Sequence, residues 1–403
     1  MKMLEKNPRG MKKADIVVGI PSHNEAATIA YPTEQTAIGL KRYFGQFDAV
    51  IINCDNNSTD GTGDNFMNAD TDDIPKMYIA TPEGIRGKGN NLRNLFKKVL
   101  ELDAKAVVVI DADLKSITPT WIKNLGEPLF KDFDFVAPLY MRHKYEDTIN
   151  NTITYPLTRC LYGRRVKQPS GGECGFSRNM VNNFLKSPLW NEDVAQFGID
   201  IWMTTLAMNE GVPICQAFLG RPKIHKSKDN MLEPGPPFRQ VISTIFALMG
   251  AYNDKWATTK WSKPTAIFGF DTEEPEMPPP VEVNKDKLYQ RFKGGFTEYW
   301  EVYRSIFSTE NFQKLREIAS LSMEHLEMPV PVWAKILFDF AIGFHKKVAT
   351  KNKTIEVLIP LYEGMILSFA NKTDGMSIQQ AEEVLEDICM QFEQTKPYLI
   401  DRW

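Results

Sequence analysis

The sequence has few cysteines, and no two of them have the spacing of a metal-binding or redox pair. Five cysteines occur in 403 residues, at positions 54, 160, 174, 215 and 389. An odd number without a Cys-x-x-Cys pair argues against a disulfide framework and against a zinc site. The pattern favours buried free thiols in a reducing compartment.

Long apolar runs and a dominant charge are also missing. The longest apolar run near the C-terminus, residues 336–344, contains Asp339 and is too short to span a bilayer. The first 13 residues are basic and polar with no apolar stretch behind them, so no secretory signal is expected. The net charge of -3, from 48 Lys and Arg against 51 Asp and Glu, gives no basic excess for a nucleic-acid partner. We therefore expect a cytoplasmic protein without an integral membrane segment.

What the sequence does contain is an alternation of strand and helix patterns in its first third. Apolar runs that predict buried strands alternate with amphipathic stretches that predict helices, the last of which begins with Thr118 as N-cap and Pro119 at the first helical position. This alternation predicts an α/β fold with a mostly parallel, Rossmann-like sheet and helices on both faces. The strands are expected at residues 16–21, 49–55, 76–80 and 106–110, and the helices at 26–44, from 62, at 89–102 and later at 199–209.

The chain is long for one domain, and its composition changes near residue 273. We expect a catalytic domain over residues 1–272, with a nucleotide-binding part at 14–115 and an acceptor part at 116–272. A Pro-rich spacer at 273–283 then leads to a helical region at 284–403. A capping box is expected at Ser377 and Gln380. Aromatic residues at helical spacing between 289 and 303 predict an apolar helix face that is buried in its own domain or in a homo-oligomer.

The strongest chemical signal is Asp111-Ala112-Asp113, which directly follows the predicted strand at 106–110. Ligands of parallel α/β sheets bind at the carboxyl ends of the strands. Two carboxylates presented there can hold a hard divalent cation such as Mg²⁺ or Mn²⁺, and that cation can bridge the oxygens of a nucleoside diphosphate. The alternative interpretation is a solvated turn after a strand.

Three further residues have the chemistry to contribute to such a site. Glu25 follows the first strand and can accept hydrogen bonds from a nucleobase, although it can equally begin the next helix. Lys88, between Gly87 and Gly89, can meet a phosphate at a helix N-terminus, or belong to a flexible basic turn. His225 is a suitable third metal ligand or an ordinary surface histidine.

A loop around Pro169 and Ser170 contains two consecutive glycines, Gly171 and Gly172. Glycines at such a place allow the backbone to pass close to a ligand or to another backbone segment. Asp200 stands at the start of a predicted helix, where its simplest role is that of an N-cap.

These segments together resemble glycosyltransferases of the GT-A fold. Such enzymes begin with a strand ending in a Pro-x-x-Asn-Glu loop, continue with an Asn-x-Ser-x-Asp-Gly turn and present a DxD motif. Within the fold, the sequence is most similar to the mannosylglycerate synthase family and its glucosylglycerate-making relatives. The shared stretches are GKG at 87–89, DADLKSITPTWI at 111–122, QPSGGE at 168–173, GID at 198–200 and His225.

The resemblance implies a role for each matching residue. Donor-binding positions would be Pro21, Glu25, Asp55, Asn56, Lys88, Asp111, Ala112, Gly171 and Gly172. Asp113 and His225 would hold the metal, and Asp113 and Asp200 would act in catalysis. Arg142, Thr154 and Ser170 would face the acceptor, with His143 or Lys144 as alternative cations.

The implied reaction is a retaining transfer of mannose or glucose from a GDP- or UDP-hexose to a small hydroxy acid such as D-glycerate, as in the synthesis of compatible solutes. Three alternatives remain at this level: a lipid-phosphate or polysaccharide acceptor, a sugar-nucleotide nucleotidyltransferase, and a non-catalytic nucleotide-sugar sensor. The nucleotidyltransferases open with a Gly-rich loop after the first strand, whereas this chain has Pro-Ser-His-Asn-Glu at 21–25.

Overall fold

The computed structural model describes residues 4–225, 234–270 and 275–403. The chain divides into two compact units. The first comprises Met1–Arg142, Val166–Asn230 and Thr265–Pro278, and the second comprises His143–Arg165, Met231–Pro264 and Pro279–Trp403. The second unit combines two segments from the expected catalytic domain with the C-terminal region, so the units differ from the divisions expected from the sequence. The predicted three-part division stays a prediction.

The first unit is built on one mixed sheet, which over the described residues has the strand order β1-β4-β3-β2-β5-β7-β6-β8-β9. The strands β4, β3, β2 and β5 are mutually parallel, as are β6, β8 and β9, and β7 joins the two sets by antiparallel pairing. The predicted α/β class with a mostly parallel sheet is confirmed. The strands are β1 (Glu5–Lys6), β2 (Ile16–Ser22), β3 (Ala49–Asp55), β4 (Lys76–Ala80), β5 (Ala106–Val109), β6 (Phe135–Leu139), β7 (Cys174–Ser177), β8 (Ile214–Phe218) and β9 (Ala266–Phe268).

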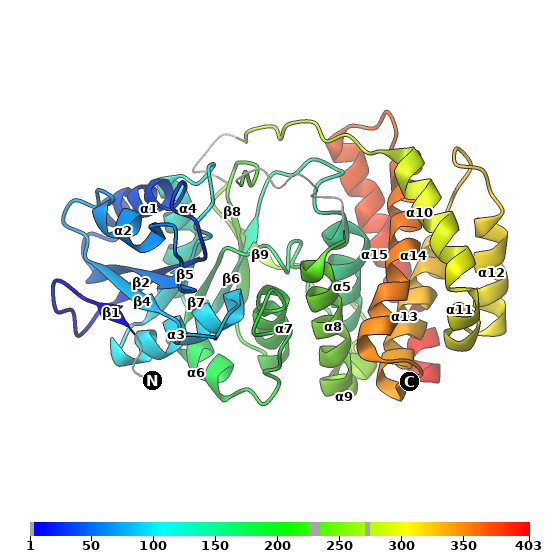
Figure 1. The fold of residues 1–403 in the computed structure, drawn as a ribbon, viewed down its shortest axis with the longest axis horizontal. Coiled ribbons are helices and arrows are strands. Elements are labelled where there is room, and N and C mark those ends of the chain that lie inside the picture. Colours follow the sequence, from blue (N-terminus) through cyan, green and yellow to red (C-terminus); the bar gives the residue numbers. More distant parts are fainter. Residues whose placement is uncertain (1–3, 226–233, 271–274) are drawn as a thin grey trace. The chain divides into compact units, whose positions relative to one another are not determined.

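Helices cover both faces of this sheet, with α1, α2 and α4 on one face and α3 and α6 on the other (Figure 1). On the first face, Ile16, Val18 and Ile20 of β2 join a buried core that also contains Trp121 of α4. On the second face, Gly19 lets α3 approach closely, since a Cβ there would lie 2.2 Å from Leu95 Cδ2. The helical elements are α1 (Ala30–Tyr43), α2 (Thr62–Asn68), α3 (Lys88–Glu101), α4 (Pro119–Gly126), η1 (Glu127–Phe130), α6 (Arg178–Lys186) and α7 (Ile199–Glu210).

The predicted elements of the first third are present, with one shifted boundary. Helix α1 begins at Ala30 rather than at residue 26. Asn24 has a left-handed φ of 56°, and the backbone N–H groups of Thr28 and Ile29 both donate to the Glu25 carbonyl. Glu25 therefore belongs to a turn before the helix, and its Oε2 accepts a hydrogen bond from the Thr28 hydroxyl at 3.0 Å.

The second unit is helical over its described residues. Its elements are η2 (Asn150–Thr154), α5 (Tyr155–Tyr162), α8 (Pro236–Ala251), α9 (Asn253–Thr258), α10 (Lys285–Glu298), α11 (Trp300–Ile306), α12 (Thr309–Ala319), α13 (Val330–Lys346), α14 (Lys351–Lys372) and α15 (Ile378–Arg402). The helical C-terminal region is thus confirmed. The capping box at α15 is also confirmed, with Gln380 N donating to Ser377 Oγ at 3.2 Å and Ser377 N donating to Gln380 Oε1 at 2.9 Å.

The aromatic row of α10 and α11 packs largely within its own unit. Phe292 and Tyr303 are fully buried. Phe292 lies against Gly364 of α14, and the Tyr303 hydroxyl donates to the Val357 carbonyl at 2.8 Å. Because this packing already covers much of the row, the row requires no second subunit, and the homo-oligomer stays a prediction.

Among the helices built from described residues, none combines the length and the apolar character that are needed to cross a bilayer.

A buried arginine joins α5 to α15 within the second unit. Arg159 has a side-chain exposure of 1%, and it contacts Glu386 at 2.5 Å and Glu393 at 2.8 Å. Its Nη1 also donates to the Tyr155 hydroxyl at 3.2 Å. The guanidinium therefore satisfies acceptors from two turns of α15 at once.

Arg159→Met should lower the free energy of unfolding by about 3–5 kcal/mol, because it leaves two carboxylates without their buried partner. Urea unfolding followed by circular dichroism measures the change. Lys314→Met is the matched control, since Lys314 pairs with Glu317 in the open, and its unfolding midpoint should not move. Equal midpoints for both variants would contradict this role of Arg159.

Candidate functional site

Polar residues gather where three neighbouring parallel strands end. β2 ends at Ser22, β3 ends at Asp55, and Asp111 follows β5, which lies beside β2 in parallel register. A cavity of about 450 Å³ opens at this edge of the sheet. It is lined by Pro21, Ser22, His23, Glu25, Asn56, Arg86, Gly87, Lys88, Asn91, Asp111, Ala112, Asp113, Gln196, Phe197 and His225.

Asp111 lies between two lysines that come from distant parts of the chain. Lys88 Nζ is 2.9 Å from Asp111 Oδ1, and Lys223 Nζ is 3.0 Å from Oδ2. Burial acts to raise the pKa of Asp111, but Lys88 and Lys223 lower it more, so the net pKa lies well below its ordinary value. Asp111 is therefore held ionised and with both oxygens fixed in direction.

Lys223 continues the network into the protein interior. Its Nζ contacts Glu173 Oε2 at 2.7 Å and donates to the Gly171 carbonyl at 2.7 Å. Glu173 is completely buried, and it accepts a short hydrogen bond from the Tyr140 hydroxyl and a 3.3 Å bond from the Asp111 backbone N–H. Burial raises the pKa of Glu173, because the surroundings penalise its charged form more than Lys223 favours it.

Lys88 also contacts a second carboxylate, that of Asp200. Lys88 Nζ lies 3.0 Å from Asp200 Oδ2, while the buried Oδ1 has no hydrogen-bond partner among the described residues. Burial raises the pKa of Asp200, and the attraction of Lys88 offsets this only in part. Since buried acceptors are normally hydrogen-bonded, the orphaned oxygen suits a ligand hydroxyl.

Asp113 and His225 form the third part of the site. His225 Nδ1 lies 3.2 Å from Asp113 Oδ1, and with Asp111 they present ligand atoms that all lie within 4.8 Å of one another. An antiparallel bridge between Leu114 and His225 and a 2.8 Å bond from Lys115 N to the Ile224 carbonyl hold the two segments together. Carboxylate and imidazole donors in this spacing fit a divalent cation.

The glycines of the Lys88 loop allow two loops to touch. The backbone N–H groups of Gly89 and Asn90 donate to the carbonyls of Gln196 and Ala195, both at 3.1 Å. A Cβ on Gly89 would lie 1.9 Å from the Val194 carbonyl oxygen, and one on Gly87 would lie 2.2 Å from that of Ala195. The N–H groups of Gly89 and Asn90 are thus engaged by protein backbone, and Lys88 contributes its side chain to the ion pairs with Asp111 and Asp200.

The comparison with protein families points to a glycosyltransferase domain. Residues 64–249 match the family model "Mannosylglycerate synthase, GT domain". The chain resembles the mannosylglycerate synthase family. This match is to a glycosyltransferase domain, the enzyme class that the sequence predicts, and the predicted α/β class is shown by the sheet described above. The matched segment contains the lysines, carboxylates and histidine of the network described above, from Lys88 to His225.

Solved structures with a similar chain trace include glucosyl-3-phosphoglycerate synthase from Mycobacterium tuberculosis. The complex with Mn²⁺, UDP and glucosyl-3-phosphoglycerate is 22% identical, has a TM-score of 0.46, and the match covers 59% of this chain and 80% of that one. The complex with Mn²⁺, UDP-glucose and glycerol 3-phosphate is also 22% identical, with a TM-score of 0.44 and the same coverage. A search of curated protein sequences finds no significant match.

The donor-binding residues that the mannosylglycerate synthase resemblance implied fall into two groups. Pro21, Glu25, Asn56, Lys88, Asp111 and Ala112 line the cavity. Asp55 is instead fully buried behind it, and its carboxylate accepts bonds from Ser22 Oγ at 2.8 Å, Ser58 N at 2.7 Å and Tyr78 OH at 2.9 Å. Asp55 therefore does not line the cavity, and its hydrogen bonds hold in place the loops that follow β2 and β3.

The Gly171-Gly172 loop reaches the network rather than the cavity lining. A Cβ on Gly172, which has a φ of 94°, would lie 2.7 Å from Lys223 Nζ and 2.9 Å from Asp111 Oδ2. The Gly171 carbonyl accepts from Lys223, as described above, and the neighbouring Ser170 is half-buried. The two glycines therefore let this loop pack directly against the ion pair.

The predicted acceptor residues lie in different units. The Arg142 guanidinium stacks on the Tyr140 ring at 5.1 Å in the first unit. Thr154 belongs to the second unit, where its buried hydroxyl donates to Asn150 Oδ1 at 3.0 Å. Lys144, also in the second unit, donates to the carbonyls of Thr373 and Met376 at 2.8 and 2.7 Å. Of the three candidate cations, Lys144 is thus committed to protein carbonyls.

The sequence reasoning missed Lys223, Glu173 and Tyr140 as parts of the site. Glu173 was visible as the last residue of the QPSGGE stretch, and Lys223 stands two positions before His225. Their hydrogen-bond partners in the site lie between 31 and 112 residues away along the chain. Only the pairing of strands brings them together, so the local pattern gave no signal for their contacts.

Gly89→Ala should reduce the free energy of unfolding by about 1–3 kcal/mol, because the new Cβ collides with backbone and separates the two loops. Differential scanning calorimetry measures this effect. In the control Gly294→Ala, an exposed helical glycine has no atom within 4 Å of the added Cβ, so stability should stay equal or rise slightly. An unchanged melting temperature for Gly89→Ala would show that the loops do not need this close contact.

Proposed function

We propose that the protein is a retaining glycosyltransferase that moves mannose or glucose from a GDP- or UDP-hexose to a small hydroxy acid such as D-glycerate. The observation that carries the proposal is the site itself. A cavity at the strand ends is lined by a metal-type cluster and by Lys88, which lies between Asp111 and Asp200, and the buried Asp200 Oδ1 has no hydrogen-bond partner among the described residues. These groups lie within the segment that matches the glycosyltransferase domain model.

In this proposal, Asp113 and His225 hold a divalent cation, Mg²⁺ or Mn²⁺. When held there, such a cation would supply positive charge for the leaving nucleoside diphosphate. Asp111 is already paired with Lys88 and Lys223, so its role is to orient the donor beside the metal pair. Glu25 and Asn56 lie at the loops where a nucleobase can be bound by hydrogen bonds.

Asp200 is proposed to position the transferred sugar or the acceptor. Its free Oδ1 can accept a hydrogen bond from a hydroxyl, while Lys88 holds the other oxygen. The attacking hydroxyl would approach from the face that the diphosphate leaves, and a diphosphate oxygen would take its proton. No side chain is assigned as a nucleophile, so the scheme contains no covalent glycosyl-enzyme step.

Arg142 is the proposed partner of the acceptor carboxylate. Its guanidinium lies over the ring of Tyr140, whose hydroxyl in turn donates to Glu173 of the buried network. A planar guanidinium can bind a carboxylate through two parallel hydrogen bonds. Thr154 and Ser170 remain proposed as further acceptor residues.

A matrix of donors and acceptors tests the proposed function. GDP-mannose, GDP-glucose and UDP-glucose are each incubated with D-glycerate, D-lactate or 3-phosphoglycerate, and the products are identified by mass spectrometry. We expect one donor to give a glycosylated hydroxy acid together with free nucleoside diphosphate. Release of pyrophosphate would instead indicate a nucleotidyltransferase, and transfer only to a lipid phosphate or polysaccharide would refute the small acceptor.

Removal of the metal should abolish transfer. EDTA should stop the reaction, and added Mg²⁺ or Mn²⁺ should restore it, because the leaving diphosphate then regains its counter-charge. His225→Gln should weaken Mn²⁺ binding by about tenfold or more, as measured by electron paramagnetic resonance. His325→Gln is the control, since His325 belongs to the second unit and its Nδ1 lies 2.9 Å from Ser322 Oγ. Full activity in EDTA would exclude the metal.

A further inference from the structure

The ion-pair network beside the cavity contains more carboxylates than lysines, and of its members Lys88, Asp111 and Asp113 line the cavity itself. The carboxylates are Asp111, Asp113, Glu173 and Asp200, and the lysines that face them are Lys88 and Lys223. A phosphate-bearing ligand that enters this cavity meets a field that opposes it. Even with a divalent cation at Asp113 and His225, every nearby lysine is already shared between carboxylates, so a further cation is required.

Arg86 supplies a cation of the right kind. It lines the same cavity and is exposed. Among the described residues that line the cavity, Lys88 and His225 are both paired with carboxylates, whereas the Arg86 guanidinium has no carboxylate partner. Its five N–H donors are thus available to a ligand, in a geometry that matches two phosphate oxygens.

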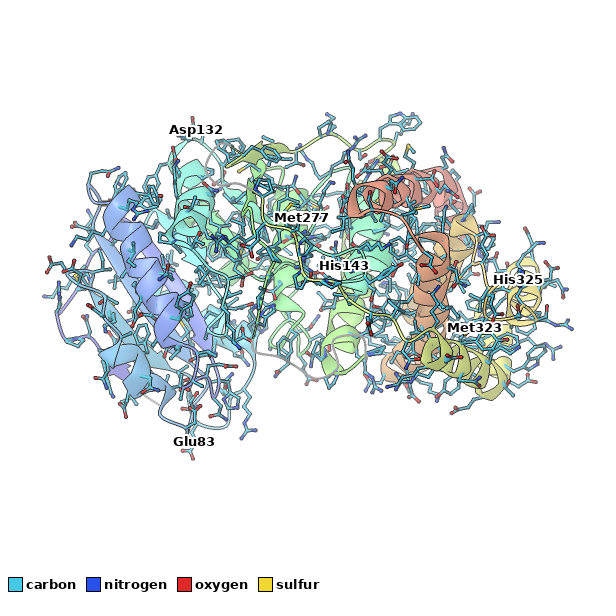
Figure 2. All side chains as sticks on the ribbon, turned by 90° about the horizontal axis from the view of Figure 1, so that it is seen from above. Glu83, Asp132, His143, Met277, Met323 and His325 are labelled. Atoms are coloured by element: carbon cyan, nitrogen blue, oxygen red, sulfur yellow. The ribbon has the colours of Figure 1, made fainter. Side chains whose placement is uncertain are left out.

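The backbone of Arg86 is anchored even though its side chain is exposed. Its carbonyl accepts from Asn90 Nδ2 at 2.8 Å and from Gln196 Nε2 at 3.0 Å. Gln196 belongs to the loop that binds the start of α3, as described above. Glu83, three residues earlier, lies at the outer edge of the first unit with its side chain directed away from the ribbon (Figure 2). The two bonds to the Arg86 carbonyl therefore hold its backbone at the cavity.

We propose that Arg86 is the phosphate-binding residue at the rim of this cavity. The proposal rests on the proposed function, because that function supplies two ligands with phosphate groups. One source is the diphosphate of the nucleotide-sugar donor, and the other is the phosphate of a phosphorylated hydroxy acid used as acceptor. Both would meet the same guanidinium chemistry, so separate experiments must distinguish them.

The direct test is binding of pyrophosphate without metal, measured by calorimetry on the full chain. Arg86→Ala should bind it about ten- to hundredfold more weakly than the wild type, because a charge-assisted hydrogen-bond pair is lost. Arg86→Lys should lie between the two, since it keeps the charge but not the fork. Arg42→Ala is the matched control: Arg42 is an exposed arginine beside Tyr43, outside this cavity.

Two further measurements identify the source of the phosphate. If the donor is the source, Arg86→Ala weakens binding of the nucleoside diphosphate and leaves binding of the nucleoside unchanged. If the acceptor is the source, nucleoside diphosphate binding is unchanged, while kcat/KM falls for 3-phosphoglycerate and not for D-glycerate. Either result supports the role of Arg86.

Equal pyrophosphate affinity of Arg86→Ala and wild type would overturn the proposal, as would a wild type that binds no pyrophosphate. These outcomes are separate from failure of the proposed function. An enzyme that transfers sugar normally while Arg86→Ala binds and reacts like the wild type refutes Arg86 alone. A protein that transfers no sugar but loses pyrophosphate binding in Arg86→Ala refutes glycosyl transfer alone.

Discussion

The pairing of Asp111 with two lysines is the interaction on which the rest of the site depends. Each lysine contacts a further carboxylate, so that Lys88 leads to Asp200 and Lys223 leads to Glu173. Buried charges are tolerated only when they are paired and hydrogen-bonded. The network therefore forces five segments of the chain to meet at one point. They are residues 86–90, 111–113, 171–173, 198–200 and 221–225.

The sheet makes this meeting possible, and the glycines allow it to be close. Parallel pairing of β2 with β3 and β5 brings their ends to one edge, and Gly172 and Gly89 let loops pack where any side chain would collide. Asp113 and His225 then lie beside the network because a bridge at Leu114 ties the two segments together. In this arrangement, Asp113, His225 and Asp111 belong to one connected set of contacts.

Much of the fold was predictable because its signals are local. The β-branched run before Asp111 and the helix opening at Thr118 and Pro119 can be recognised within a few residues. The strands β6, β7 and β8 were not predicted, since Cys174–Ser177, for example, has one large apolar residue and a glycine. Such segments become strands because their neighbours in the sheet pair with them, which is tertiary information.

The candidate site shows the same division. The Asp-x-Asp pair, Lys88 and His225 could be chosen because their residue types suit metal and phosphate beside a strand end. The buried position of Asp55 could not be foreseen, because it depends on Tyr78 and Ser58 reaching its carboxylate. The partnership of Lys223 with Glu173 likewise required the three-dimensional arrangement.

The central claim is that this buried network fixes the proposed metal ligands, Asp113 and His225, in position relative to the proposed donor-binding carboxylate of Asp111. Its most direct test is the affinity of Lys223→Met for a nucleoside diphosphate, with and without Mn²⁺, in protein whose circular dichroism spectrum matches the wild type. We predict that Mn²⁺ strongly increases the affinity of the wild type, and that most of this increase is lost in the variant. The same Mn²⁺-dependent increase in both proteins would contradict the account.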